Sequence, residues 1–427
     1  MRNRILYILF ICASALSAQM LFAQSGSQNA LSKSAEQNEF DQKKALEFTQ
    51  EKRLVGINQV IASIEKNNPT LSGLRLDTDA EKIGNRTGIF PANPEAGFNY
   101  LWGSPEVIND RKDFSIMQSF DFPTAYGYRN SISRLKNEQA EYAYSIRMKE
   151  ILAEAYTVCA EIIYRNALND LLTERLRQAK ELAGIYQKRL ETGDANILES
   201  NKAQLNLLTV TGKLETNERE RQALLSELRA LNGGNDINFS DTAFPVIVVE
   251  TDFTIWYSLA EKSNPELQYL NLETSVKNKQ QQLYKSLWLP QLSAGYMSES
   301  LPGEKFRGVS VGMSIPLWQN RNTVKYAKAK NLAASQFATG SRLLFENRMK
   351  AAHTKVISLQ HDLEAFRNGL SSLGNINFLV KALNSGQISL SEYLLELTYY
   401  YEASDQLLEL EYSVAKAYGE LIYYRNQ

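Results

Sequence analysis

Asn68-Pro69-Thr70-Leu71 recurs 196 residues later as Asn264-Pro265-Glu266-Leu267. The order and spacing of other residues repeat in the same way. The matching intervals are 25 residues from Pro69 to Pro94 and from Pro265 to Pro290, and 70 residues from Pro123 to Gly193 and from Pro316 to Gly386. The chain is therefore a duplication, and its unit is far longer than the roughly 20–50 residues of a solenoid repeat.

The prolines also define where long helices can form. Residues 124–244 and 317–427 contain no proline, and a proline inside a helix costs about 3 kcal/mol or more. Apolar residues between Ile151 and Leu190 recur in steps of three and four, as on one face of a helix. We therefore expect long helices over 124–192 and 317–385, each followed by a return helix, over 196–231 and 389–426.

The first repeat is assigned to residues 51–245 and the second to 246–427. A helix of 70 residues extends roughly 105 Å, several times the diameter of a compact domain. Each return helix has about half that length, and the leading helical segments, 57–89 and 252–289, have the other half. We expect a return helix and a leading segment to stack end to end beside each long helix.

Short alternating segments lie between the leading and long helices, in predicted β-hairpins over 94–123 and 290–316. In residues 309–315 the apolar side chains of Val, Val, Met and Ile alternate with Ser, Gly and Ser. Segments of about nine residues match a membrane-crossing β-strand. The apolar face would contact lipid, and the small polar face would line a lumen. The alternative is a pair of soluble hairpins packed on helices.

The N-terminus has the pattern of an export signal over residues 1–23. Arg2 and Arg4 precede an apolar stretch from Ile5 to Ala18, with small residues for cleavage after Ala18 or Ala23. Residues 24–50 are polar and without periodicity, and we interpret them as a flexible lead-in.

Charge and composition exclude several classes of protein. The chain has 47 basic and 48 acidic residues, for a net charge of -1. It therefore lacks the surplus of Lys and Arg that a nucleic-acid binder needs. Two Cys and two His are too few for a disulfide scaffold or a zinc-cluster protein. His353 and His361 are too far apart along one helix to share a metal, and Cys159 lies on an apolar face, as a core residue would. We predict no catalytic site, no metal and no cofactor.

Two motifs of the form Gly-x-x-x-x-x-Glu follow the long helices, at 193–199 and 386–392. Together with the duplicated Asn-Pro-x-Leu starts and the proline-flanked strand pairs, they make residues 55–427 resemble the TolC-like outer-membrane efflux proteins, in the branch of the CusC- and CzcC-type metal efflux proteins. The resemblance implies a mainly α fold with a small membrane β part. Three chains would each give four strands to a 12-stranded barrel and four helical rods to an α-barrel. The segment between Gly233 and Pro265, with its apolar run Val246–Val249, resembles the equatorial belt of this family.

The resemblance also implies a function. The protein would be a homotrimer in the outer-membrane lipid, extending into the periplasm. It would passively conduct substrates expelled by an inner-membrane pump of the RND type through a periplasmic adaptor (membrane fusion) protein. The branch points to metal cations as the substrate. A periplasmic coiled-coil scaffold without membrane insertion is the main alternative, and a metal-dependent periplasmic enzyme is a more distant one.

The helix tips hold the candidate site residues. By motif match, the adaptor would dock at Gly193, Asp194, Gly386 and Gln387. Three acids would form rings of like charge that constrict the pore and favour cations: Glu199, Glu392 and, one turn further, Glu396. The alternative is that these carboxylates are solvated acids on a helix surface.

Overall fold

The computed structural model describes residues 56–105, 107–372 and 376–423. The predicted signal peptide (1–23) and lead-in (24–50) lie outside the described residues. All helices and strands below belong to one compact unit, formed by Ile57–Ile237 and Asp241–Gln427.

The order of elements repeats, as the duplication predicts. The first half holds α2 (Ile57–Asn67), α3 (Pro69–Gly84), β1 (Glu95–Leu101), β2 (Arg111–Phe120), α4 (Pro123–Thr192) and α5 (Ile197–Leu231). The second half holds α6 (Phe253–Ser263), α7 (Pro265–Ser286), β3 (Gln291–Leu301), β4 (Glu304–Ser314), α8 (Thr323–Ser372), α9 (Ile376–Asn384) and α10 (Leu390–Ile422). Helix α4 alone has 70 residues, about 105 Å of rise. The mainly helical fold with four strands is confirmed.

The Asn-Pro motifs start helices α3 and α7. The side-chain oxygen of Asn68 accepts a hydrogen bond from the backbone N–H of Leu71 at 3.0 Å, and Asn264 does the same for Leu267 at 3.1 Å. The proline that follows occupies the first helical turn, where its missing N–H costs nothing and its fixed φ suits a helix. The repeated motif is therefore a repeated helix cap.

The return and leading helices meet end to end beside α4. Asn68 Nδ2 donates to the carbonyl of Leu231, the last residue of α5, at 2.8 Å. Ser63 Oγ on α2 donates to Asn232 Oδ1 at 2.9 Å. A Cβ on Gly233, which has φ of +67°, would lie 2.4 Å from the Asn67 carbonyl oxygen, so only glycine permits this junction.

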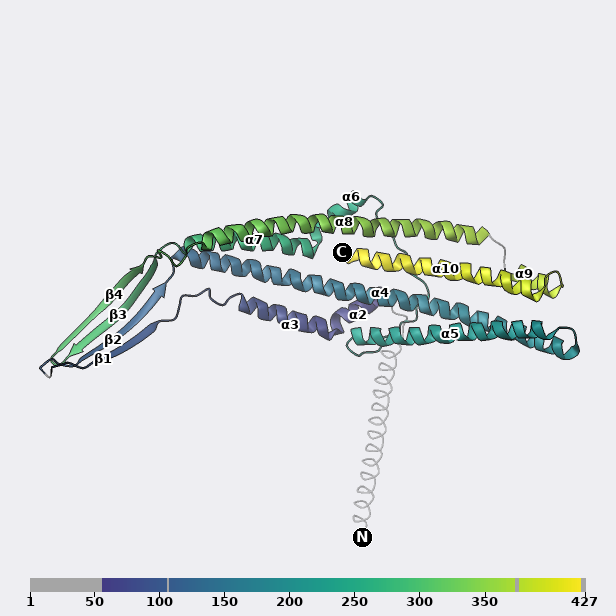
Figure 1. Cartoon of the computed structure of the whole chain (residues 1–427), viewed down its shortest axis with the longest axis horizontal. Helices are drawn as coiled ribbons and strands as arrows, with labels where there is room; N and C mark the ends of the chain where they lie inside the picture. The colour runs from purple at the N-terminus through teal and green to yellow at the C-terminus, as the bar shows by residue number, and fades with distance from the viewer. Residues whose placement is uncertain (1–55, 106, 373–375, 424–427) are drawn as a thin grey trace, which may run out of the picture. The chain divides into compact units, whose positions relative to one another are not determined.

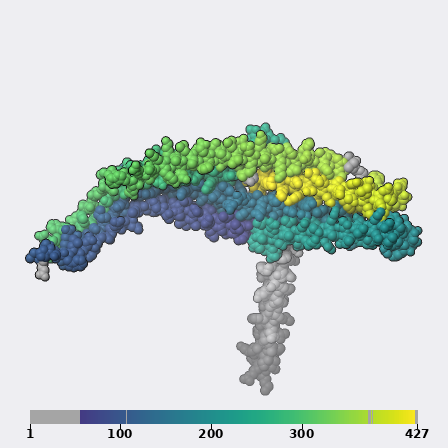
Figure 2. All heavy atoms as spheres, in the orientation of Figure 1, coloured from purple at the N-terminus to yellow at the C-terminus, as the bar shows by residue number. Residues whose placement is uncertain are grey.

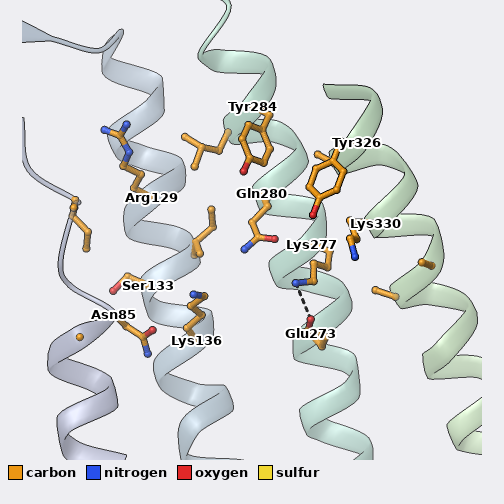
Figure 3. Close-up of a pocket in the computed structure, with 18 of the residues that line it drawn as sticks. Asn85, Arg129, Ser133, Lys136, Glu273, Lys277, Gln280, Tyr284, Tyr326 and Lys330 are labelled. Atoms are coloured by element: carbon orange, nitrogen blue, oxygen red, sulfur yellow. Dashed lines mark ion pairs between the residues drawn. The ribbon is translucent and has the colours of Figure 1, made fainter. Parts of the chain in front are cut away.

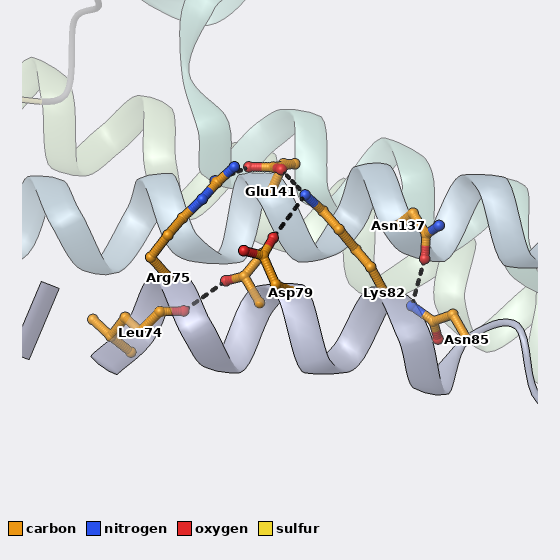
Figure 4. Close-up of polar contacts among 8 residues, drawn as sticks. Leu74, Arg75, Asp79, Lys82, Asn85, Asn137 and Glu141 are labelled. Atoms are coloured by element: carbon orange, nitrogen blue, oxygen red, sulfur yellow. Dashed lines mark hydrogen bonds and ion pairs between the residues drawn. The ribbon is translucent and has the colours of Figure 1, made fainter. Parts of the chain in front are cut away.

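An apolar cluster closes the corresponding junction of the second half. It joins Leu421 of α10 to Trp256 of α6, Leu267 of α7 and Met349 of α8, and all four are buried. In the first half, α3 is also bound to α4 by charge: Glu141 contacts Arg75, at 2.7 Å between Nη1 and Oε2, and Lys82 (Figure 4).

The second long helix differs from the prediction over 317–385. Helix α8 begins at Thr323, because residues 317–322 form bends and turns and Asn322 has a left-handed φ of 67°. Asparagine tolerates this conformation better than most residues. The remainder of the predicted helix corresponds to α8 and α9, and residues 373–375 between them are outside the described part of the chain.

The two hairpins form one antiparallel sheet in the order β1-β2-β3-β4. Strand β2 of the first repeat pairs with β3 of the second, with Ile116 opposite Tyr296. The sheet lies at one end of α4 and α8, and the turns after α4 and α9 lie at the opposite end (Figure 1). The described helices include none that is both long and apolar enough to cross a membrane.

Candidate functional site

The sheet has one apolar face that continues across all four strands. The register places Ala96 opposite Ile116, Ile116 opposite Tyr296, and Tyr296 opposite Val309, so this row crosses all four strands. Phe98 and Phe114 lie opposite each other on the same face of β1 and β2. These side chains are exposed, and Val309 is 85% exposed. An exposed apolar surface of this extent indicates a contact with lipid or protein.

The opposite face of the sheet carries mostly small and polar side chains, with Met117 and Met297 among them. A Cβ on Gly295 would lie 2.3 Å from Met117 Sδ, and one on Gly312 would lie 2.6 Å from Ser293 Oγ. Glycine at these positions therefore lets the neighbouring side chains cover the strand. This is the face that the sequence predicts to line a lumen.

Aromatic residues mark both ends of the sheet. Trp102 follows β1 and is 80% exposed, whereas Trp288 precedes β3 and Trp318 follows β4 at the other end. Strands β3 and β4 have 11 residues each, so at a tilt of about 45° they span about 25 Å. This is the height of the apolar band of an outer-membrane barrel, which aromatic girdles flank.

Both edges of the helical layer are apolar as well. Helices α3 and α5 pack on α4, α4 packs on α7 and α10, and these pack on α8, so α3 and α5 lie at one edge and α8 at the other (Figure 2). Exposed leucines and isoleucines occur on both edges. They are Leu76 and Ile83 on α3, Leu205 and Leu208 on α5, and Leu332 and Leu343 on α8.

The predicted docking residues are exposed at the two helix tips. Gly193 and Gly386 have left-handed φ values of 82° and 73°, which the reversal after each helix requires. Asp194 accepts a hydrogen bond from the Thr192 hydroxyl at 2.7 Å. Docking at these exposed residues stays a prediction.

The predicted constriction acids Glu199 and Glu392 cap the helices on which they lie. Glu199 Oε2 accepts from the backbone N–H of Asn196 at 3.0 Å, and Glu392 Oε2 accepts from that of Ser389 at 2.8 Å. Each N-cap side chain accepts in return from the backbone N–H of its glutamate, which completes a capping box. The backbone N–H and the hydroxyl of Ser389 lower the pKa of Glu392. Glu396 is exposed one turn further along α10. A role in the pore stays a prediction for all three.

Two contacts that sequence reasoning missed join the tips of the two repeats. Lys202 Nζ on α5 donates to Ser391 Oγ on α10 at 2.6 Å. Tyr186 of α4, Ala203 of α5 and Tyr393 of α10 are buried in one apolar cluster at the same tips. No sequence signal identifies such a pair, because 189 residues separate Lys202 from Ser391.

Another contact that sequence reasoning missed joins α4 to α10 further from the tips. The Arg175 side chain is 6% exposed, and its Nη2 lies 2.7 Å from Asp405 Oδ1. Its Nη1 donates to Asp405 Oδ2 at 3.0 Å, and its guanidinium lies 4.2 Å from the ring centroid of Tyr401. The hydroxyl of Tyr401 donates to Gln178 on α4 at 2.9 Å.

A cavity of about 770 Å³ lies on one face of the helical layer near the sheet. Its wall is formed by the end of α3 with the loop that follows it, and by α4, α7 and α8 (Figure 3). Four of its charged residues are basic, namely Arg129, Lys136, Lys277 and Lys330, and Glu273 is the acidic one.

The histidines and the cysteine have surroundings typical of structural residues. His353 is buried, and its Nε2 lies 2.6 Å from the Glu250 carbonyl oxygen in the predicted belt segment, whereas His361 is exposed. Burial raises the pKa of the Cys159 thiol to about 12. Within the described part of the chain, no three His, Cys, Asp or Glu residues are grouped to hold a metal ion.

Comparison with known proteins finds the same fold in solved structures. CusC, studied for its transmembrane channel formation, superimposes with a TM-score of 0.73 and 14% identity, over 88% of this chain and 93% of its own. The CmeC outer membrane channel of Campylobacter jejuni superimposes with a TM-score of 0.66 and 16% identity, over 86% of this chain and 85% of its own. The outer membrane protein VceC of Vibrio cholerae superimposes with a TM-score of 0.71 and 12% identity, over 86% of this chain and 95% of its own.

No protein-family model and no curated protein sequence matches the chain. The superpositions on solved structures, at 12–16% identity, confirm the predicted TolC-like fold. The assignment to the branch of CusC stays a prediction.

Proposed function

We propose that this protein is one subunit of a trimeric outer-membrane duct, the outer part of a tripartite efflux system. The observation that carries the proposal is the two-faced sheet with aromatic residues at both ends. Its apolar face suits lipid, and its small polar face suits a water-filled lumen.

The edges of the subunit support a closed ring. Among the described strands, β1 and β4 each leave one edge unpaired, and an open edge in hydrocarbon costs several kcal/mol for each unsatisfied backbone group. If β4 of one copy pairs with β1 of the next, every subunit makes the same head-to-tail contact. Such contacts form a closed ring when the rotations between successive subunits add up to a full turn. Three copies would supply 12 strands.

The helical edges extend the same contact beyond the sheet. Leu332 and Leu343 lie on the side of α8 turned away from the buried Phe345 and Met349. Leu205 and Leu208 lie on the side of α5 turned away from α4, where Ala203 is buried. In the ring, the α8 edge of one subunit would cover the α3 and α5 edge of its neighbour. The helices would then form the wall of a tunnel.

The partners follow from the position of the tips. A periplasmic adaptor would dock at the exposed turns around Gly193 and Gly386, and would connect the duct to an inner-membrane pump, for which the resemblance indicates the RND type. The same resemblance is the basis for metal cations as the substrate. A passive duct conducts what its pump delivers, so no chemical step is assigned to this chain.

Two neighbouring substitutions on β4 separate the duct from a periplasmic scaffold. Val311 belongs to the apolar face and Ser310 to the small polar face. An arginine on the lipid side near the bilayer centre costs about 2–4 kcal/mol. We expect Val311→Arg to deplete the protein from the outer membrane by about tenfold or more, and Ser310→Arg to leave insertion unchanged.

The measurement is the amount of protein in the outer-membrane fraction, followed by light scattering in detergent and conductance in planar bilayers. Wild type and Ser310→Arg should form trimers that conduct ions. A protein that fractionates with the periplasm as a monomer, with both variants unchanged, would refute the duct and favour the scaffold.

A further inference from the structure

Contacts of Asp121 link the cavity near the sheet to the small polar face of the strands. Asp121 directly follows Phe120, the last residue of β2, which lies on the apolar face. By the alternation of side chains along a strand, Asp121 belongs to the side of the small polar face. Its carboxylate contacts Arg129 Nη2 at 2.5 Å and accepts from Gln291 Nε2 at 2.8 Å. Since Arg129 also lines the cavity, the cavity would open to the duct in the assembly proposed above.

The acidic residue of the cavity wall, Glu273, already has two partners. Glu273 Oε1 lies 3.0 Å from Lys277 Nζ, and its Oε2 accepts from Gln139 Nε2 at 2.8 Å. Arg129 has Asp121 as its partner. Among the described residues, no carboxylate lies within ion-pair distance of Lys136 or Lys330, although the charge of Lys136 contributes to lowering the pKa of Glu273. Asp77 and Glu81 line the adjoining cavity without pairing with Lys136.

An aromatic ring lies beside the ammonium group of Lys330. Lys330 Nζ lies 5.7 Å from the ring centroid of Tyr326, and the phenol side chains of Tyr284 and Tyr326 border the same space (Figure 3). Phe337, which is 74% exposed, adds an apolar surface about two turns further along the same face of α8 as Lys330. An ammonium group beside aromatic surface suits a ligand with one anionic group on an apolar body.

We propose that this cavity is a binding site for amphipathic organic anions, such as aromatic sulfonates and carboxylates, held by Lys136 and Lys330. This proposal rests on the duct function, because it places the site on the lumen side. Three such sites around one duct would favour the passage of anions over cations. The cargo class would then differ from the metal cations that the resemblance suggests.

A pair of lysines on α8 supplies a matched test. Lys328 and Lys330 are both exposed, but two residues place them about 200° apart around the helix, and only Lys330 lines the cavity. At about 0.1 M salt, where screening acts over about 10 Å, we expect Lys330→Gln to lower the chloride-to-potassium permeability ratio about twofold. Lys136→Gln with Lys330→Gln should lower it further, and Lys328→Gln should leave it unchanged.

The permeability ratio comes from reversal potentials of trimers in a KCl gradient, and 1-naphthalenesulfonate serves as the amphipathic probe. We expect the probe to block wild-type current and to block Lys330→Gln at least threefold less tightly. Conducting trimers whose selectivity and block are the same in Lys330→Gln and Lys328→Gln would overturn the anion site while leaving the duct intact. Absence of any conductance would instead refute the duct.

Discussion

Removing the partner of Arg175 should loosen α10 from α4. The Arg175 side chain is 6% exposed and the Asp405 side chain 33% exposed, so Asp405→Asn leaves a mostly buried cation without its counter-charge. Breaking a fully buried pair costs about 3–5 kcal/mol. Because Asp405 is partly solvated, we expect about 2 kcal/mol for the local opening of this helix pair.

Hydrogen–deuterium exchange measures this opening directly in trimers kept in detergent. A cost of about 2 kcal/mol corresponds to roughly thirtyfold faster exchange of backbone amides around Tyr401 and Asp405. The double variant Arg175→Met with Asp405→Leu should recover most of the protection, because apolar side chains can replace a buried pair without loss.

Arg177 provides the control, since it also pairs with carboxylates, Glu174 and Glu181, but its side chain is 62% exposed. Exposed pairs contribute about 0–1 kcal/mol, so Arg177→Met should change exchange little. The reasoning is wrong if Asp405→Asn exchanges like wild type, or if the double variant is less protected than Asp405→Asn.

Three further outcomes are expected. Burial lowers the pKa of Lys149 to about 8, below its value in the unfolded chain, so the unfolded state binds more protons between pH 8 and about 10.5. Thermal unfolding should therefore show that Lys149→Met stabilises the protein most below pH 8, with a gain that shrinks as the pH rises towards 10.5. A constant gain across this range would contradict the assignment. Gly386→Ala, at a φ of 73°, should cost about 1–2 kcal/mol. The control Gly340→Ala lies inside α8, where a Cβ has open space, and should be neutral or stabilising. If chemical denaturation gave both variants the same change in the free energy of unfolding, the backbone strain expected at residue 386 would be contradicted. Glu392→Ala should raise antibiotic leakage and single-channel conductance if the carboxylate constricts the pore, whereas Ser389→Ala weakens the same cap but keeps the charge. Equal leakage in these two variants would assign Glu392 to the cap alone.

The elements that sequence reasoning predicted depend on neighbours along the chain. Asn68 and Asn264 cap helices within three residues, and the left-handed Gly193 ends α4 by its own backbone preference. The capping boxes were also readable, because Asn196 and Ser389 each stand three residues before a glutamate. The interpretation of Glu199 and Glu392 as constriction acids passed over this local signal.

The contacts that sequence reasoning missed depend on residues far apart. Lys202 meets Ser391 and Arg175 meets Asp405 across 189 and 230 residues. An isolated lysine or arginine on a long helix has no pattern that identifies its partner. The cavity near the sheet is similar, since Lys136 and Lys330 come from different repeats and share no motif.

The sequence by itself determined the duplication, the long helices and the two-faced strands. Each of these follows from proline spacing, helix caps or side-chain period, which act over a few residues. Only the tertiary structure decided how the two repeats combine: β2 beside β3, α10 against α4, and four helices around one basic cavity. The physical reason is that packing between rods is set by the rotation and offset of whole helices, which no local stretch of sequence encodes.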